Sequence, residues 1–134
     1  KLEAVIENHT PIPENDLDTA FTEKLTLSAA VTAVKRHAGR LRHLYGPGGK
    51  KTIAEGKDLT NIKYIIGTGG ALTRLPNRVD ILKEIPRSNK GNELLPNTEA
   101  EILVDNYYIM ASLGVMSINY PEAALKLLKE SLKI

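Results

Sequence analysis

Several residue types are absent or scarce in this chain of 134 residues. It contains no cysteine, so it holds no disulfide, no cysteine-based zinc site and no thiol nucleophile. It has no tryptophan and one phenylalanine beside five tyrosines, which argues against a stacking surface for single-stranded nucleic acid. Apolar runs such as Tyr64–Ile66 and Ile102–Val104 are far too short to span a bilayer. We therefore expect neither nucleic acid nor a membrane as a partner.

The rest of the composition is that of an ordinary globular domain. Hydrophobic residues make up 42% and charged residues 25%, and the net charge is +2, which argues against global disorder. We expect residues 1–24 to form an acidic linker with a short helix, and residues 25–134 to form one α/β domain. The chain begins with Lys1 and shows no secretory signal. We therefore expect a cytoplasmic protein, and a fragment of a longer chain.

The spacing of apolar residues predicts a helix over residues 26–44, where they recur every three or four positions. That stripe consists of Leu27, Val31, Val34, Ala38 and Leu41. The predicted strands are 52–55, 64–66 and 102–104, of which the last two are expected to be buried. The other predicted helices are 71–75, 79–85, 107–119 and 121–134. Pro86 is expected to end the helix over 79–85, and the loop over 87–100 has room for a short strand at 94–95.

This order of elements predicts an α/β fold with a small, partly parallel sheet and packed helices. Parallel strands need crossover connections, and the apolar helices between the predicted strands supply them. Two or three short strands make a narrow sheet. We therefore expect the unit to complete a larger sheet or domain.

The sharpest chemical feature is the run Gly67-Thr68-Gly69-Gly70, between the strand at 64–66 and a predicted helix. Glycines at such a junction let the backbone turn sharply and let a ligand approach closely. Ligands of open α/β sheets gather at the carboxyl ends of strands. The run lacks the third glycine of the dinucleotide fingerprint, because Leu72 stands in its place, and it is not a Walker A loop. A binding site and a plain tight turn are equally compatible with this pattern.

Asp105 ends the second predicted buried strand and precedes a helix. Its carboxylate either caps that helix, which the pattern favours, or faces a ligand at the same edge of the sheet. We count Asp105 with Gly67, Thr68, Gly69 and Gly70 as candidate cofactor-binding residues. No Ser–His–Asp set or carboxylate pair has a meaningful spacing, so we identify no catalytic residue. The histidines do not share the spacing of a helical zinc pair, so we identify no metal site.

Two other segments are rich in lysine, arginine or glycine. The segment Gly46–Lys51 follows a predicted helix, so we interpret it as a hairpin or helix-ending turn and not as a phosphate loop. A basic stretch without intervening acids comprises Lys35, Arg36, Arg40, Arg42, Lys50 and Lys51. Since the whole chain carries only +2, we interpret this stretch as a solvated helix face or as a patch that docks onto an acidic partner.

Three stretches of the sequence together resemble one protein family. They are Lys35–Leu41, then Gly56–Thr60 leading into Ile66–Gly70, and finally Asp105–Ala111 with Leu113-Gly114 and Tyr120–Ala124. Over roughly residues 26–134 the chain is similar to the carboxyl-terminal part of the glutamate mutase accessory proteins, called MutL or GlmL. These proteins are unrelated to the mismatch-repair protein that shares the first name.

The resemblance implies a fold, a cofactor and a partner. The family resembles the actin/Hsp70/sugar-kinase ATPases, so it implies the carboxyl-terminal nucleotide-binding subdomain of an actin-like (ribonuclease H-like) ATPase. It implies that Gly67, Thr68, Gly69 and Gly70 contact the adenosine of ATP or ADP, with Mg²⁺ bound in the full-length parent. It further implies a partner, the subunits of an adenosylcobalamin-dependent mutase. The parent would use ATP to release damaged cobalamin so that fresh cofactor can enter.

The phosphate motifs and the metal-binding carboxylate of that superfamily have no match in this chain. We therefore expect half of an ATP site, and no ATP hydrolysis by the segment alone. Two alternatives stay open. The first is part of a sugar or acyl kinase of the same superfamily. The second is a non-catalytic protein-interaction module, in which the predicted helix and its basic face dock on a partner.

Overall fold

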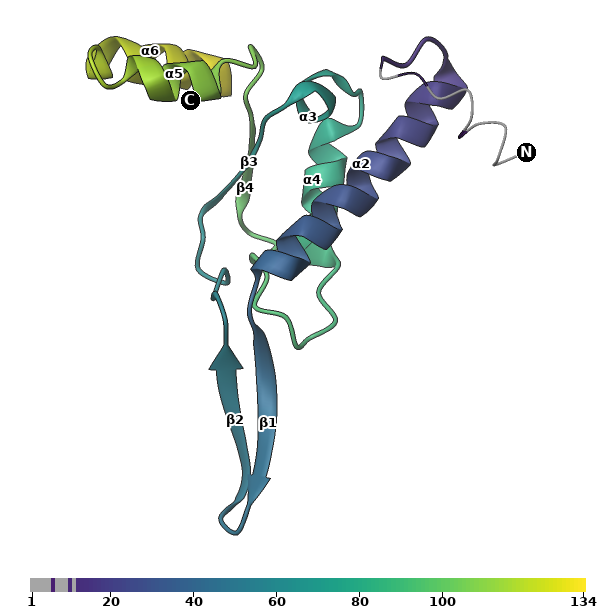
Figure 1. Cartoon of the computed structure of the whole chain (residues 1–134), viewed down its shortest axis with the longest axis vertical. Helices are drawn as coiled ribbons and strands as arrows, with labels where there is room; N and C mark the ends of the chain where they lie inside the picture. The colour runs from purple at the N-terminus through teal and green to yellow at the C-terminus, as the bar shows by residue number, and fades with distance from the viewer. Residues whose placement is uncertain (1–5, 7–9, 11) are drawn as a thin grey trace.

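The computed structural model describes residues 6, 10 and 12–134. In chain order its elements are α2 (Asp16–His37), β1 (Arg40–Gly46), β2 (Gly49–Glu55), β3 (Tyr64–Gly67), α3 (Gly70–Arg74), α4 (Arg78–Arg87), β4 (Glu101–Val104), α5 (Met110–Met116) and α6 (Pro121–Leu132). Figure 1 shows β3 and β4 beside α2 and α4, with the β1–β2 hairpin projecting from one end and α5 and α6 at the other. The mixed α/β class is thus confirmed. Residues 1–5, 7–9 and 11 of the predicted linker lie outside the described residues.

A single long helix, α2, begins within the predicted acidic linker. The Asn15 side-chain oxygen accepts a hydrogen bond of 3.0 Å from the Asp18 backbone N–H, and so caps the first turn. The helix then continues to His37 without a break, so it joins the predicted short helix to the predicted long one. In the described part of the chain, no helix has both the length and the apolar character needed to cross a membrane.

The residues after α2 form a β-hairpin. Strands β1 and β2 pair antiparallel, from Arg40 opposite Glu55 at the base to Gly46 opposite Gly49 at the turn. The predicted strand at 52–55 is confirmed, and so is the interpretation of the glycine-rich segment as a hairpin turn. Gly49 has φ +95°, a backbone conformation that glycine adopts without strain.

The predicted helix over 26–44 is wrong beyond His37, and the cause lies at the base of the hairpin. Ala38 is already extended, with φ −69° and ψ 147°. At Gly39 the two strands approach so closely that a Cβ would lie 2.4 Å from the Glu55 carbonyl oxygen and 2.7 Å from the Gly56 carbonyl carbon. Glycine is also a poor helix former. The helix-like spacing of the later apolar residues is therefore overridden by pairing with a distant segment.

Strands β3 and β4 pair in parallel, as predicted, from Tyr64 opposite Glu101 to Gly67 opposite Val104. One face of this small sheet packs on the helices. Its core consists of Leu82, Ile85 and Val104, flanked by the partly buried Ala30, Val31, Val34, Ile65, Leu72 and Ile102. On the other face, Tyr64 and Ile66 are 51% and 37% exposed. The predicted burial of the first strand is therefore wrong for its outer face.

Helix α4 corrects the expected effect of Pro86. The helix runs through this proline to Arg87. Beyond it the Ser88 N–H donates to the Glu84 carbonyl oxygen at 2.9 Å, so helical hydrogen bonding resumes. Proline removes only its own donor, and near the end of a helix little bonding is left to disrupt.

The remaining differences from the predicted elements lie near the loops. Residues 94–95 form no strand, although Leu94 and Leu95 are buried and the Leu94 N–H donates to the Gly39 carbonyl oxygen at 2.8 Å. Helix α5 is shorter than predicted, because residues 105–108 form a turn instead of its first turn. Helix α6 begins at Pro121, as predicted, and ends at Leu132.

Helix α2 is fastened to the rest of the chain at two points along its length, Glu23 and Lys35. The Glu23 carboxylate accepts hydrogen bonds from the backbone N–H and the side-chain amide of Asn77, both at 2.9 Å. Near the carboxyl end of the helix, Lys35 Nζ donates to the Ser88 carbonyl oxygen at 2.7 Å and pairs with Glu93 at 3.2 Å. Lys35 is therefore not part of a solvated basic face.

Replacing Gly39 with alanine tests the packing at the base of the hairpin. The added Cβ would meet backbone atoms, which must shift, so we expect the free energy of unfolding to fall by about 1–3 kcal/mol. Gly48→Ala is the matched control, since nothing lies within 4 Å of the Cβ it would add. Urea unfolding followed by circular dichroism measures both variants. Equal stability of the two would show that the close approach at Gly39 is not required.

Candidate functional site

The glycine run lies at the carboxyl end of β3, and its members differ sharply in their surroundings. Gly67 is buried, and a Cβ there would lie 2.6 Å from Leu82 Cδ1, so this glycine lets β3 pack on α4. Gly69 has φ +91° and precedes the first residue of α3. An added Cβ at Gly69 or Gly70 would have no atom within 4 Å. The second half of the run therefore borders open space.

Asp105 links this turn to the two last helices. Its backbone N–H donates to the Gly67 carbonyl oxygen at 2.9 Å, which extends the parallel ladder past the end of β4. Its side chain is completely buried. Its carboxylate accepts four hydrogen bonds, from Thr68 Oγ1 (3.0 Å), Met110 N (2.9 Å), Ile109 N (3.2 Å) and Ser131 Oγ (2.5 Å). The structure thus brings two predicted site residues, Thr68 and Asp105, into direct contact.

Burial and hydrogen bonding act on the pKa of Asp105 in opposite directions. Burial penalises the charged form and by itself would raise the pKa. The hydrogen bonds from Ser131, from the Met110 and Ile109 amides and from Thr68 favour the charged form, and together they hold the pKa of Asp105 below its ordinary value. Asp105 is therefore an ionised carboxylate that satisfies the first amides of α5, which is the capping role that the sequence pattern favours.

Sequence reasoning misses Ser131, the donor from α6. Ser131 is completely buried, and its hydroxyl also accepts a hydrogen bond of 3.1 Å from the Tyr107 N–H. Its carbonyl oxygen accepts another of 2.8 Å from the Asn106 side-chain amide. One signal was present in the sequence, since Ser131 falls on the same helical face as Ala124 and Leu128. A hydroxyl on an apolar stripe needs a buried partner.

Two of the stretches that carry the family resemblance, Lys35–Leu41 and Gly56–Thr60, meet at the base of the hairpin. The Gly39 N–H donates to the Lys57 carbonyl oxygen at 2.6 Å, and Lys57 Nζ lies 3.4 Å from His37 Nε2. Asp58 accepts hydrogen bonds from the Thr60 hydroxyl at 2.6 Å and the Thr60 N–H at 2.9 Å, and these lower the pKa of Asp58. These residues stabilise the connection between β2 and β3, and none of these contacts involves the glycine run.

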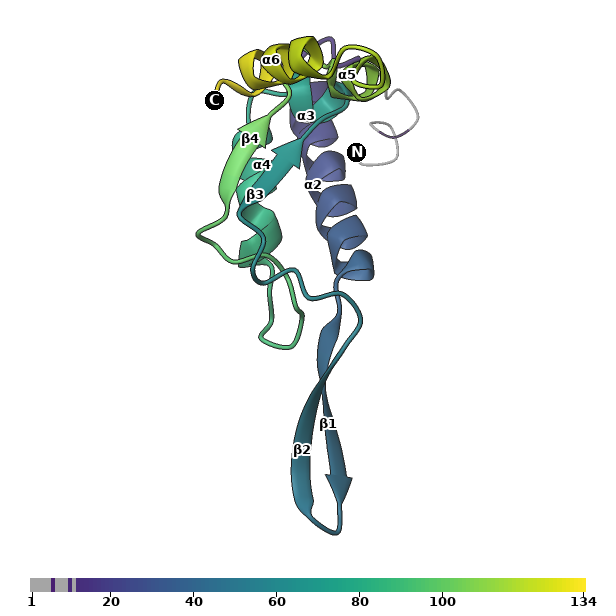
Figure 2. The same ribbon diagram turned by 90° about the vertical axis from the view of Figure 1, so that its left-hand side faces the viewer.

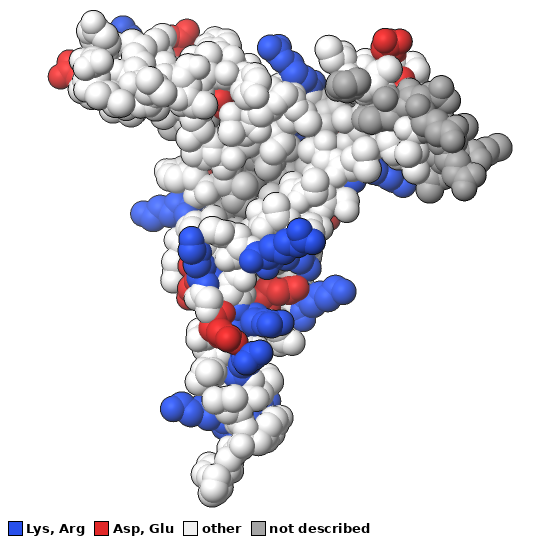
Figure 3. Space-filling view, in the orientation of Figure 1, with Lys and Arg blue, Asp and Glu red and all other residues white. Residues whose placement is uncertain are grey.

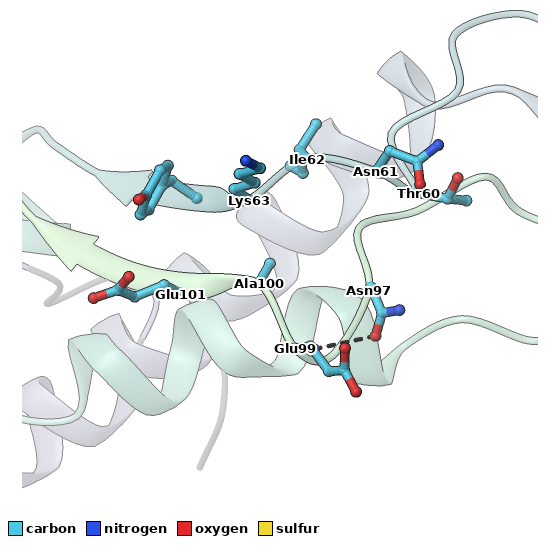
Figure 4. Close-up of a pocket in the computed structure, with 9 residues that line it drawn as sticks. Thr60, Asn61, Ile62, Lys63, Asn97, Glu99, Ala100 and Glu101 are labelled. Carbon is cyan, nitrogen blue, oxygen red and sulfur yellow. Dashed lines mark hydrogen bonds between the residues drawn. The ribbon is translucent and has the colours of Figure 1, made fainter.

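A cavity of about 360 Å³ lies at the opposite, amino-terminal end of β3 and β4. It is lined by Thr60, Asn61, Ile62, Lys63, Tyr64, Asn97, Glu99, Ala100 and Glu101 (Figure 4). None of the predicted site residues lines it. In the part of the chain that the structure describes, no three His, Asp or Glu side chains form a group that could hold a metal ion.

The fold and the site define a small mixed α/β unit with a glycine turn at the carboxyl end of a parallel strand. The family model described as "MutL protein" matches residues 1–132. The chain is 31% identical over 121 residues to Protein MutL of Clostridium tetanomorphum, an alignment that covers 90% of this chain and 26% of the relative. No solved structure matches it. The chain belongs to the MutL protein family, and it spans about a quarter of this curated relative's length.

Replacing Asp105 with asparagine tests the buried charge. The amide keeps the shape of the side chain but places a donor against donors, so we expect the free energy of unfolding to fall by about 2 kcal/mol or more. Asp80→Asn is the control, because Asp80 is 72% exposed on α4, and we expect it to change stability by about 0.5 kcal/mol at most.

The buried charge of Asp105 also predicts how the free energy of unfolding changes as the pH falls. The native pKa of Asp105 lies below its unfolded value of about 3.9, so the charge stabilises the fold fully above that value. The stabilisation is lost as the pH falls through the lower native pKa. Urea unfolding measured from pH 7 down into this range should show a smaller acid-induced loss for Asp105→Asn than for the wild type. An unchanged pH profile would contradict the role assigned to the carboxylate.

Proposed function

We propose that this segment forms the adenosine side of an ATP site in a longer MutL protein, a reactivation chaperone for an adenosylcobalamin-dependent mutase of the glutamate mutase type. The observation that supports nucleotide binding is the open glycine turn at the carboxyl end of β3. Open α/β sheets bind their ligands at this edge. Membership of the MutL family supports the mutase half.

The surroundings of the turn suit an uncharged nucleoside. Adenosine needs close contact and complementary shape more than it needs positive charge. The open space beside Gly69 and Gly70 is a volume that a side chain at either position would fill. Gly67 has a packing role instead, because the space that its side chain would occupy is taken by the side chain of Leu82 and is closed to a ligand.

Asp105 and Thr68 act in this proposal by positioning the turn. A carboxylate has about four lone-pair sites, and Asp105 already receives four hydrogen bonds from the protein. The Thr68 hydroxyl donates its one proton to Asp105, so toward a ligand it could act only as an acceptor. A bound nucleoside would therefore meet the backbone of residues 68–70, while the carboxylate keeps that backbone in place.

The phosphate groups and Mg²⁺ are assigned to the rest of the parent chain. ATP, when bound with Mg²⁺, supplies the free energy of phosphoryl transfer. The residues of this segment bind and orient, and Asp105 joins the turn to α5 and α6. A ligand that prefers one arrangement of two domains shifts the parent toward it, and such a shift would open the mutase for cobalamin exchange.

The second candidate function, a non-catalytic interaction module, is favoured by the projecting β1–β2 hairpin (Figure 1). Under this alternative the glycine run is only a turn. The two functions differ in whether substitution of an open glycine affects nucleotide binding.

Gly70→Ala and Gly70→Val in the full-length MutL protein test the nucleotide proposal. Both side chains enter open space at a position without a positive φ, so the fold should tolerate them. They would fill the proposed nucleoside volume, and we expect ADP affinity, measured by isothermal titration calorimetry, to fall progressively, by about tenfold or more for valine, which is about 1.4 kcal/mol.

Gly48→Val, in the hairpin turn, is the matched control because its side chain also enters open space. We expect it to leave ADP affinity unchanged. Wild-type affinity in Gly70→Val would contradict the proposed contact, and a full-length protein that binds no nucleotide would refute the ATP site altogether.

A further inference from the structure

The segment that contains the β1–β2 hairpin has a local excess of positive charge. Residues 38–57 contain five cations and one carboxylate, a net charge of +4, whereas the whole chain carries +2 and the remainder therefore −2. Those cations are Arg40, Arg42, Lys50, Lys51 and Lys57. In Figure 3, Lys and Arg side chains outnumber Asp and Glu over the lower half of the molecule, where the hairpin and its base lie.

The hairpin extends away from the helices, as Figures 1 and 2 show from two directions. Apart from the half-buried Leu41 and Ile53, its residues are exposed. Near the tip, Tyr45 is 78% and Leu44 is 49% exposed. Two strands without a covering layer are marginally stable in water. The exposed Leu44 and Tyr45 lie among the basic side chains of the hairpin. This combination of apolar and charged side chains is typical of a protein interface.

A cavity of about 570 Å³ lies at the base of this hairpin, against the loop after α4. It is lined by Arg40, Leu41, Arg42, His43, Lys90, Asn92 and Glu93. The Leu41 N–H donates to the Asn92 carbonyl oxygen at 2.7 Å, so the strand and the loop are held together. This hydrogen bond joins two segments that line the cavity, so the fold itself holds the cavity's lining together.

The carboxylates near this surface are already engaged. Glu93 pairs with Lys35 at 3.2 Å and accepts a hydrogen bond of 2.8 Å from the Lys90 N–H, and Arg42 pairs with Glu55 at 2.7 Å. Among the cations of strands β1 and β2 and of the cavity lining, Arg40, Lys50, Lys51 and Lys90 form no ion pair with a described residue. The surface thus presents uncompensated positive charge along β1, β2 and the cavity.

We propose that the hairpin and the cavity at its base bind an acidic segment of a partner protein. Carboxylate side chains would meet the unpaired cations, and apolar side chains of the partner would cover Leu44 and Tyr45. A nucleic acid fits less well, because Glu55 and Glu93 lie among the cations and Tyr45 is the one Phe, Tyr or Trp side chain of the hairpin.

The test uses the full-length protein and a fluorescently labelled poly-glutamate peptide, whose binding is followed by anisotropy at low and at physiological salt. We expect Lys50→Gln/Lys51→Gln to weaken binding by about threefold to tenfold, because an exposed charge pair contributes only modestly to affinity. Lys126→Gln/Lys129→Gln is the matched control, since it removes the same charge from the exposed face of α6. We expect the control to bind like the wild type, and binding to weaken as salt rises.

Three outcomes would overturn the proposal. The first is no binding of the peptide at low salt. The second is equal weakening by the two double variants, which would show a response to net charge alone. The third is tighter binding of a labelled single-stranded oligonucleotide that is lost in Lys50→Gln/Lys51→Gln, which would make the hairpin a nucleic-acid surface. All of these lysines are exposed, so circular dichroism should report an unchanged fold.

Discussion

The carboxylate of Asp105 is the junction on which one end of this structure depends. A buried charge is costly unless hydrogen bonds replace its water, and here four donors from the turn after β3, the start of α5 and the end of α6 do so. Strands β3 and β4 have only four residues each. A sheet of that size has little ladder to hold its carboxyl end, so one side chain secures three segments that are distant in the sequence.

The parts of the fold that local patterns determine could be predicted from the sequence. The β-branched strand before the glycines, the apolar strand before Asp105 and the proline that starts α6 all carry their signals within a few residues. The parallel pairing of the two strands followed from the helices between them. The capping role of Asp105 was favoured for the same reason, because its position before a helix is a local feature.

The parts that the sequence did not predict depend on contacts between distant residues. The apolar spacing through Leu41 is that of a helix, yet the close contact of Gly39 with Gly56 ends the helix and starts a strand. The bond between Ser131 and Asp105 joins residues 26 positions apart. The glycine run shows the same limit, since only the surroundings distinguish the glycine that packs on α4 from those beside open space.

Helix α2 places the two candidate surfaces in a fixed relation. Its Glu23 holds the residue that precedes α4, close to the short helix after the glycine turn, and its Lys35 holds the loop that lines the cavity of the hairpin. A helix of 22 residues is about 33 Å long and stiff along its axis. Gly39 follows this helix after one residue and packs against the backbone of Glu55 and Gly56, so the base of the hairpin lies close to the end of the helix. Helix α2 therefore contacts both the segment beside the glycine turn and the loop beside the hairpin, so a ligand at the turn and a partner at the hairpin would bind to parts of the chain that one helix joins.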